Sequence, residues 1–255
     1  MLRHIAPALR TTMLLAALFA AFATAASAQS NPLFVPLPGG VKAALYKPDN
    51  NPNPAVGFLI VHRTSNVMNH IGCTELSKRG FAVLCLNPRS ENNEAIVDWE
   101  KLPLDVKPGM EYLRNKVGVK KIVLFGHSGG GATTTFYRAV AENGPSYCQG
   151  ANKLTQCDNS LAGLPKADGV VIVDAHPAIA VNNLRAINPA VTDESRPDKV
   201  DPSLDPFNPA NGYNPKGVSK YSPDFVKRYS AAQAKRLNAW IDKALDIRAR
   251  MKAGT

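Results

Sequence analysis

One segment of the sequence, residues 121–131 (KIVLFGHSGGG), restricts the fold more than any other. Its opening apolar run is typical of a strand buried on both faces of a sheet. Glycines on both sides of Ser128 leave room for a tight, strained turn, and a helix is expected over residues 130–142. The segment therefore predicts a strand, a sharp turn and a helix, with the Ser128 hydroxyl presented at the edge of the sheet.

Other apolar runs predict further strands of the same sheet. A hairpin is expected from residues 33–37 and 41–46, closed by Pro38, Gly39 and Gly40. Continuous apolar runs predict buried strands at residues 56–62, 81–86 and 168–174, with helices at 73–79 and 98–116 between them. We expect Pro103 and Pro108 at or before the start of the second helix. This alternation predicts an α/β protein with a mostly parallel, doubly wound sheet and an antiparallel hairpin at one edge.

The pattern changes after Asp174, because a proline-rich segment replaces the strands and is followed by one long helix from Ser222 and Pro223. We assign residues 29–187 to the α/β core and residues 188–255 to a lid-like segment. The long helix carries one apolar stripe, which we expect to dock on the core: Val226, Tyr229, Leu237, Trp240, Ala244, Ile247 and Met251.

The first 28 residues have the layout of a secretory signal peptide. Arg3 and Arg10 precede an apolar run at residues 13–23, and Ala26, Ser27 and Ala28 offer a cleavage site before Gln29. The run is short for a transmembrane helix, which makes an uncleaved anchor the weaker alternative. We therefore expect a secreted or periplasmic protein without a membrane span.

In an oxidising compartment the four cysteines can form disulfides. Cys148 and Cys157 flank a short polar stretch and are the favoured pair. Cys85 lies inside an apolar run and is either a buried thiol or the partner of Cys73. No cysteine or histidine spacing predicts a metal site, and no cofactor is expected.

The net charge of +10 is concentrated near the C-terminus, where residues 216–255 hold ten Lys or Arg against three Asp. We interpret this run as the solvated face of the long helix and expect no nucleic-acid partner. The sequence does not indicate an oligomeric state.

From about Leu33 to Asp174 the chain resembles esterases, lipases and dienelactone-hydrolase-like enzymes of the α/β-hydrolase fold, whose first six strands it would supply. The resemblance rests on the strand, the G-x-S-x-G turn around Ser128 and the following helix. It implies attack by Ser128 on a carbonyl carbon and an acyl-enzyme that water releases. We expect the substrate to be a small or medium acyl ester. The resemblance also implies an oxyanion hole from the N–H of Gly129 and an N–H after the third strand, which we assign to Arg63 or Thr64. His62 matches the family's His-Gly pair, whereas Arg63 replaces the glycine.

The acid and the base of the triad are not evident, because no histidine follows His176. Three explanations compete. The chain is a C-terminally truncated piece of a longer enzyme, or a degenerate protein that only binds ligands. Alternatively, Asp174 and His176, after the strand that follows the turn, act as acid and base. We expect His127 to pack beside the turn and His70 to be structural.

Overall fold

The computed structural model describes residues 32–151, 153, 155–177 and 179–254. The expected signal peptide and its cleavage site therefore lie outside the described residues. The chain divides into two compact units, one ending at His176 and one beginning at Pro177, and each is described by itself. Residues 177–187, which the sequence analysis assigned to the core, belong to the second unit.

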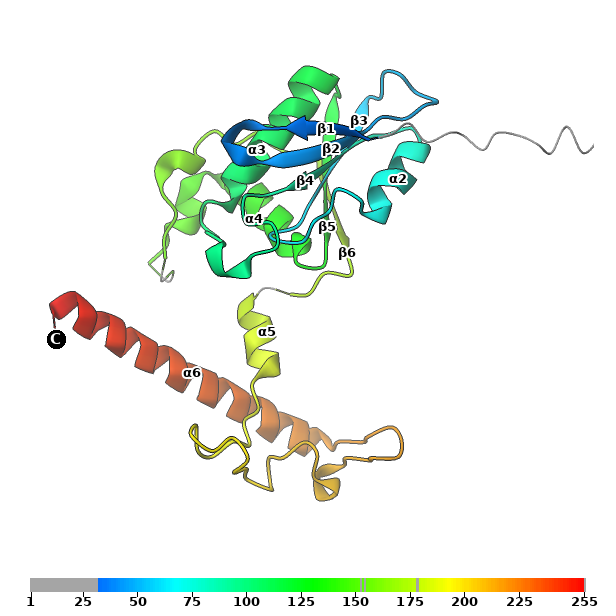
Figure 1. Ribbon diagram of the computed structural model, residues 1–255. Coiled ribbons are helices and arrows are strands. Elements are labelled where there is room, and N and C mark those ends of the chain that lie inside the picture. The colour runs from blue at the N-terminus through cyan, green and yellow to red at the C-terminus, as the bar shows by residue number, and fades with distance from the viewer. Residues whose placement is uncertain (1–31, 152, 154, 178, 255) are drawn as a thin grey trace, which may run out of the picture. The chain divides into compact units, whose positions relative to one another are not determined.

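The first unit contains one six-stranded sheet in the order β1-β2-β4-β3-β5-β6 (Figure 1). Its strands are β1 (Leu33–Pro36), β2 (Lys42–Tyr46), β3 (Val56–Val61), β4 (Ala82–Asn87), β5 (Lys121–His127) and β6 (Gly169–Val173). β2 pairs antiparallel with both β1 and β4, and the remaining neighbours are parallel. The predicted mostly parallel sheet with an antiparallel hairpin at one edge is confirmed.

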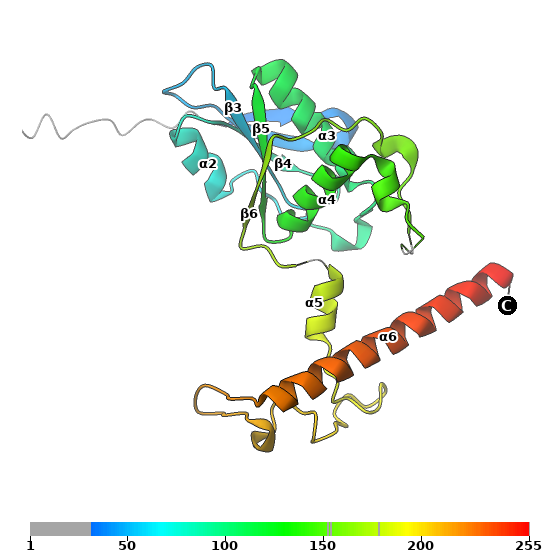
Figure 2. The same ribbon diagram turned by 180° about the vertical axis from the view of Figure 1, so that it is seen from behind.

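Helices cover both faces of the sheet (Figures 1 and 2). Helices α3 (Leu102–Tyr112) and α4 (Gly130–Asn143) lie on one face, and α2 (Ile71–Lys78) lies on the other. Successive residues of a strand point to opposite faces, so Leu59 joins the cluster under α3 and α4 while Ile60 joins the cluster around α2. Both side chains are fully buried. The result is a three-layer α/β/α sandwich.

Pro108 corrects one detail of the sequence analysis, because it lies inside α3 and not at its start. Pro103 does occupy the first turn, where a missing N–H costs nothing. Pro108 is buried, and a Cβ on the next residue, Gly109, would come within 2.6 Å of Leu59 and Leu86. This part of the helix lies directly against the sheet, where burial of the proline ring offsets the lost backbone hydrogen bond.

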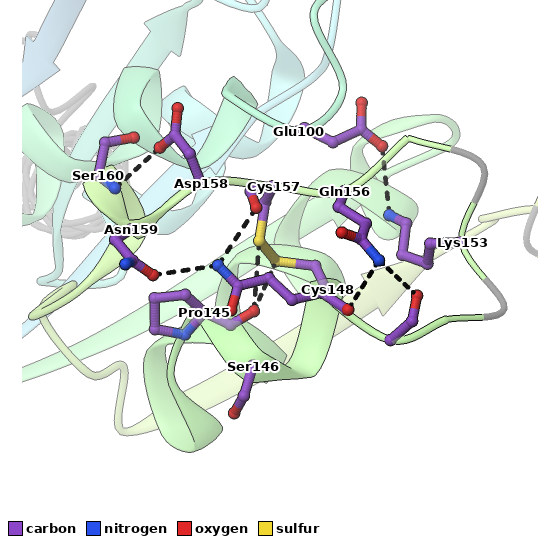
Figure 3. Close-up of a disulfide and its surroundings, with 12 residues drawn as sticks. Glu100, Pro145, Ser146, Cys148, Lys153, Gln156, Cys157, Asp158, Asn159 and Ser160 are labelled. Atoms are coloured by element: carbon purple, nitrogen blue, oxygen red, sulfur yellow. Dashed lines mark hydrogen bonds and ion pairs between the residues drawn. A yellow bond between two sulfur atoms is a disulfide. The ribbon is translucent and has the colours of Figure 1, made fainter. Parts of the chain in front are cut away.

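Two disulfides are present in the first unit. The predicted Cys148–Cys157 bridge closes a loop after α4, and Figure 3 shows the polar side chains around it. Within that loop Gln149 donates to Cys157 O at 3.2 Å and to Asn159 Oδ1 at 3.1 Å. Cys73 and Cys85, left open by the sequence, form the second bridge and join α2 to β4.

The second unit consists of α5 (Ile179–Ala186), a long irregular segment and α6 (Pro223–Ala253). As predicted, Ser222 caps α6 by accepting the N–H of Phe225 at 3.1 Å. Gln233 donates to the carbonyls of Arg185 at 3.1 Å and Ile187 at 3.0 Å, which holds the end of α5 against α6. No sequence pattern had predicted α5.

The apolar stripe of α6 is largely exposed, with Trp240 at 44%, Ile247 at 41% and Met251 at 75%. Of the helices in the described part of the chain, none combines the length and apolar character needed to cross a bilayer.

Candidate active site

Ser128 lies between β5 and α4 in a left-handed backbone conformation, with a φ of 53°. L-residues other than Asn and Asp rarely adopt this region, and such strain is concentrated at functional sites. The flanking glycines are required sterically. A Cβ on Gly126 would lie 2.5 Å from Gly130 O, and a Cβ on Gly130 would overlap Val61 O. The strand, turn and helix predicted for this segment are present.

The loop after β3 lies beside Ser128, but only one of its two expected oxyanion donors remains available. The N–H of Thr64 donates to His62 Nδ1 at 3.0 Å, so it cannot also point at a ligand. This corrects the assignment of Thr64. Of the two expected residues, Arg63 therefore keeps a backbone N–H that could bind an oxyanion, as does Gly129.

A second loop, residues 90–94, fixes the loop at residues 62–65. Asn92 N–H donates to Thr64 O at 2.7 Å, and Ser90 Oγ donates to Arg63 O at 2.7 Å. The Glu94 carboxylate accepts from Arg63 Nε at 3.0 Å and from Thr64 Oγ1 at 2.8 Å. Burial raises the pKa of Glu94, but these hydrogen bonds and the charge of Arg63 outweigh burial, so the pKa lies below its usual value.

The Arg63 side chain reaches from this loop to the turn that holds Ser128. Its guanidinium lies 5.4 Å from the centre of the Trp99 ring, in cation–π geometry. Nη1 packs so closely on Gly129 that a Cβ there would overlap it. Only 18% of the Arg63 side chain is exposed. A positive charge is thus held against the residue after Ser128.

The hydrogen bonds of His62 determine which of its nitrogens carries the proton. Nδ1 accepts the N–H groups of Thr64 at 3.0 Å and Ser65 at 2.8 Å, so the neutral ring is protonated at Nε2. Burial, followed by the nearby charge of Arg63, lowers the pKa of His62 to about 4. Nε2 faces Gly129, where a Cβ would lie 2.6 Å away. His62 is therefore a neutral donor and not a base for Ser128.

Two further histidines pack beside the turn. The rings of His70 and His127 lie 5.0 Å apart, and His70 Nδ1 accepts the N–H of Gly72 at 3.0 Å, which caps α2. Burial lowers the pKa of His70, and the charge of His127 lowers it further. These contacts agree with the structural roles expected for both residues.

Asp174 and His176 follow β6, the neighbour of β5. Val173 pairs with His127 and accepts the N–H of Ser128 at 3.1 Å, which places Asp174 next to the turn. Asp174 is also left-handed, with a φ of 43°. The charge of His176 contributes to lowering the pKa of His62, so these two histidines lie within electrostatic range. Both hydrogen bonds found for Ser128 in the described part of the chain are made by its backbone.

The strand order 1-2-4-3-5-6, with a left-handed serine after β5, decides the fold of the first unit. The first unit has the α/β-hydrolase fold. No family model matches the sequence, and neither does any curated protein. The likenesses are to solved structures, among them an esterase from Butyrivibrio proteoclasticus at 20% identity, covering 45% of this chain and 47% of that chain with a TM-score of 0.37.

Two other solved α/β structures are similar to a comparable extent. An α/β serine hydrolase without a lid from Xanthomonas campestris is 17% identical over 57% of this chain and 70% of that chain, with a TM-score of 0.38. An acetyl xylan esterase from Aspergillus awamori is 20% identical over 43% and 47%, with a TM-score of 0.36. The chain thus spans about half the length of two of these three structures. Likenesses this distant do not identify a substrate.

The sequence analysis missed two residues that shape this α/β-hydrolase site, Glu94 and Trp99. Both lie between β4 and α3: Glu94 begins a short 3-10 helix (Glu94–Ile96), and Trp99 falls within the expected helix 98–116 but before α3 begins at Leu102. The one available signal was Arg63 itself, because a partly buried arginine needs an acid and often an aromatic face nearby.

Proposed function

We propose that this chain is a serine hydrolase that cleaves a carboxylic ester, or a related acyl bond, through an acyl-enzyme on Ser128. The observation that carries the proposal is the left-handed Ser128 between β5 and α4. Its Oγ would attack the carbonyl carbon, the alcohol would leave, and water would release the acid from the serine.

The negative charge that develops on the carbonyl oxygen would be stabilised by donors around Gly129. The N–H of Gly129 begins α4, whose N-terminal end favours negative charge. The neutral Nε2–H of His62 faces Gly129, and the N–H of Arg63 belongs to the same loop. Because the loop is fixed by residues 90–94, these donors would be oriented before a ligand arrives.

For the proton transfers we propose His176 as the base and Asp174 as the acid that orients it. The support is their position after β6, next to the hydrogen bond between Ser128 N–H and Val173 O. A base is required, because a serine hydroxyl is a poor nucleophile without one.

A second candidate is a ligand-binding protein that retains the fold without turnover. It is favoured by the fact that the hydrogen bonds of Ser128 in the described residues involve its backbone alone. A fluorophosphonate probe separates the two, because only an activated serine is labelled. We expect labelling of the wild type, loss of labelling in Ser128→Ala, and normal labelling in Ser146→Ala, a control at an exposed serine outside the site. An unlabelled wild-type protein with a native circular dichroism spectrum would favour the binding protein.

We further propose that the protein is exported and that the mature chain begins at Gln29. The two disulfides support an oxidising compartment. N-terminal sequencing of protein from the native host tests this, and a chain that still begins at Met1 would contradict it.

A further inference from the structure

The Arg63 guanidinium has more donors than the protein uses. An arginine offers five N–H donors in a planar fork, and here one of them, on Nε, is bonded to Glu94 Oε2 at 3.0 Å. The other carboxylate oxygen of Glu94 accepts from Thr64 Oγ1. Glu94 is therefore shared with the loop and does not form a bidentate pair with the fork of Arg63.

The unused terminal nitrogens are accessible to solvent. In the described residues every buried side-chain nitrogen or oxygen has a hydrogen-bond partner. Because the terminal nitrogens of Arg63 make no hydrogen bond within this part of the chain, they must be exposed to solvent at least in part. Nη1 lies against Gly129, directly after Ser128, so this accessible edge borders the space where an ester carbonyl would lie.

The position of the fork is fixed, which favours a defined ligand. Trp99 supports the guanidinium plane and Glu94 holds Nε, so the side chain is ordered before binding and loses little entropy on binding. A fixed guanidinium fork matches the geometry of a carboxylate, which it can bind through two parallel hydrogen bonds.

We propose that Arg63 binds a carboxylate on the substrate, so that the site prefers esters with a free carboxylate near the scissile bond over neutral esters of the same shape. The inference rests on the proposed hydrolase function and adds a substrate class to it. Arg63 is here a specificity-determining residue, and its side chain acts separately from its backbone N–H.

The test uses two pairs of esters, each with a charged member and a neutral member of similar shape. One pair, p-nitrophenyl hydrogen glutarate and p-nitrophenyl pentanoate, places the carboxylate in the acyl part. The other, 4-carboxyphenyl acetate and phenyl acetate, places it in the alcohol part. The measured quantity is the ratio of kcat/KM within a pair, so a uniform loss of activity leaves it unchanged.

We expect the wild type to favour the charged ester in at least one pair, and Arg63→Gln to reduce that ratio by about tenfold or more. Arg63→Lys, which keeps the charge but not the fork, should give an intermediate ratio. Arg79→Gln, which removes the same charge from a surface pair with Glu75, should leave the ratio at its wild-type value. A wild type without preference in either pair, or a preference that survives in Arg63→Gln, would overturn the proposal.

A binding experiment separates this proposal from the hydrolase function. In Ser128→Ala, calorimetry with monomethyl glutarate should show a Kd about tenfold lower than in the double variant with Arg63→Gln. If the wild type is neither active nor labelled, this difference would uphold the carboxylate site and reject the hydrolase. Equal binding by the two variants would overturn the carboxylate site.

Discussion

The imidazole of His62 accepts the backbone N–H of Ser65 at Nδ1, over 2.8 Å. Protonation of Nδ1 would break this bond and the neighbouring bond from Thr64, which agrees with a pKa lowered to about 4. In the unfolded chain the pKa of a histidine is about 6.5. Between these two pKa values the unfolded state binds more protons than the folded state. The contribution of neutral His62 to the free energy of unfolding is therefore fully present above pH 6.5 and is lost as the pH falls toward 4.

We therefore expect His62→Asn, which keeps an acceptor near Nδ1 but does not titrate, to lose less stability between pH 7 and pH 4. The difference from the wild type should be at most about 3 kcal/mol, because one pKa unit corresponds to about 1.4 kcal/mol. Urea unfolding at several pH values measures it. Parallel stability profiles for the two proteins would show that His62 does not carry this effect.

Replacement of Ser128 by glycine should relieve backbone strain. At a φ of 53° a residue with a Cβ is disfavoured, whereas glycine adopts this region freely. We expect Ser128→Gly to be more stable than Ser128→Ala by about 1 kcal/mol, although neither variant has the hydroxyl. In the right-handed helix α4 glycine is instead the less stable residue, so Ala139→Gly should lower the free energy of unfolding by about 1 kcal/mol. Equal midpoints for the two Ser128 variants in thermal unfolding would contradict the strained turn.

The Cys148–Cys157 bridge should stabilise the first unit by restricting the unfolded chain. For a sequence separation of 9 residues the chain-entropy model gives about 2.6 kcal/mol. We expect the double variant Cys148→Ala/Cys157→Ala to lose roughly that amount in urea unfolding. Non-reducing peptide mapping of the exported protein should recover both bridges, and free thiols at Cys148 and Cys157 would refute the pairing in the mature protein.

The edge strand β6 should promote self-association. In the described sheet it pairs with β5 alone, and Val171, Ile172 and Val173 are 36%, 49% and 37% exposed. Apolar edge strands add strands from other molecules, and a lysine on the edge opposes this. We expect Ile172→Lys to shift the protein toward the monomer in size-exclusion chromatography with light scattering. Val218→Lys, at an exposed loop residue of the second unit, is the control, and an equal effect of both would reject the edge as the cause.

The sheet could be predicted because its strands are continuous apolar runs, and the turn because glycines surround Ser128. α5 was missed for a physical reason: its eight residues (IAVNNLRA) are too few for a clear period and are tied to α6 by Gln233, which is far away in the sequence. The hydrogen bond from the Thr64 N–H to His62 Nδ1 could not be predicted either, because it depends on the rotamer of the His62 side chain. Sequence reasoning located the strained turn at Ser128 but not the tertiary contacts around it.

The bonds from residues 90–94 to the loop at residues 62–65 have a kinetic consequence. A loop fixed by Asn92, Ser90 and Glu94 has no ordering step left to complete when a small molecule arrives. Association should then follow the encounter frequency of the two molecules, with an observed rate that rises linearly with ligand concentration and does not reach a plateau. Glu94→Ala, by freeing the loop, should introduce the plateau that marks a slow rearrangement.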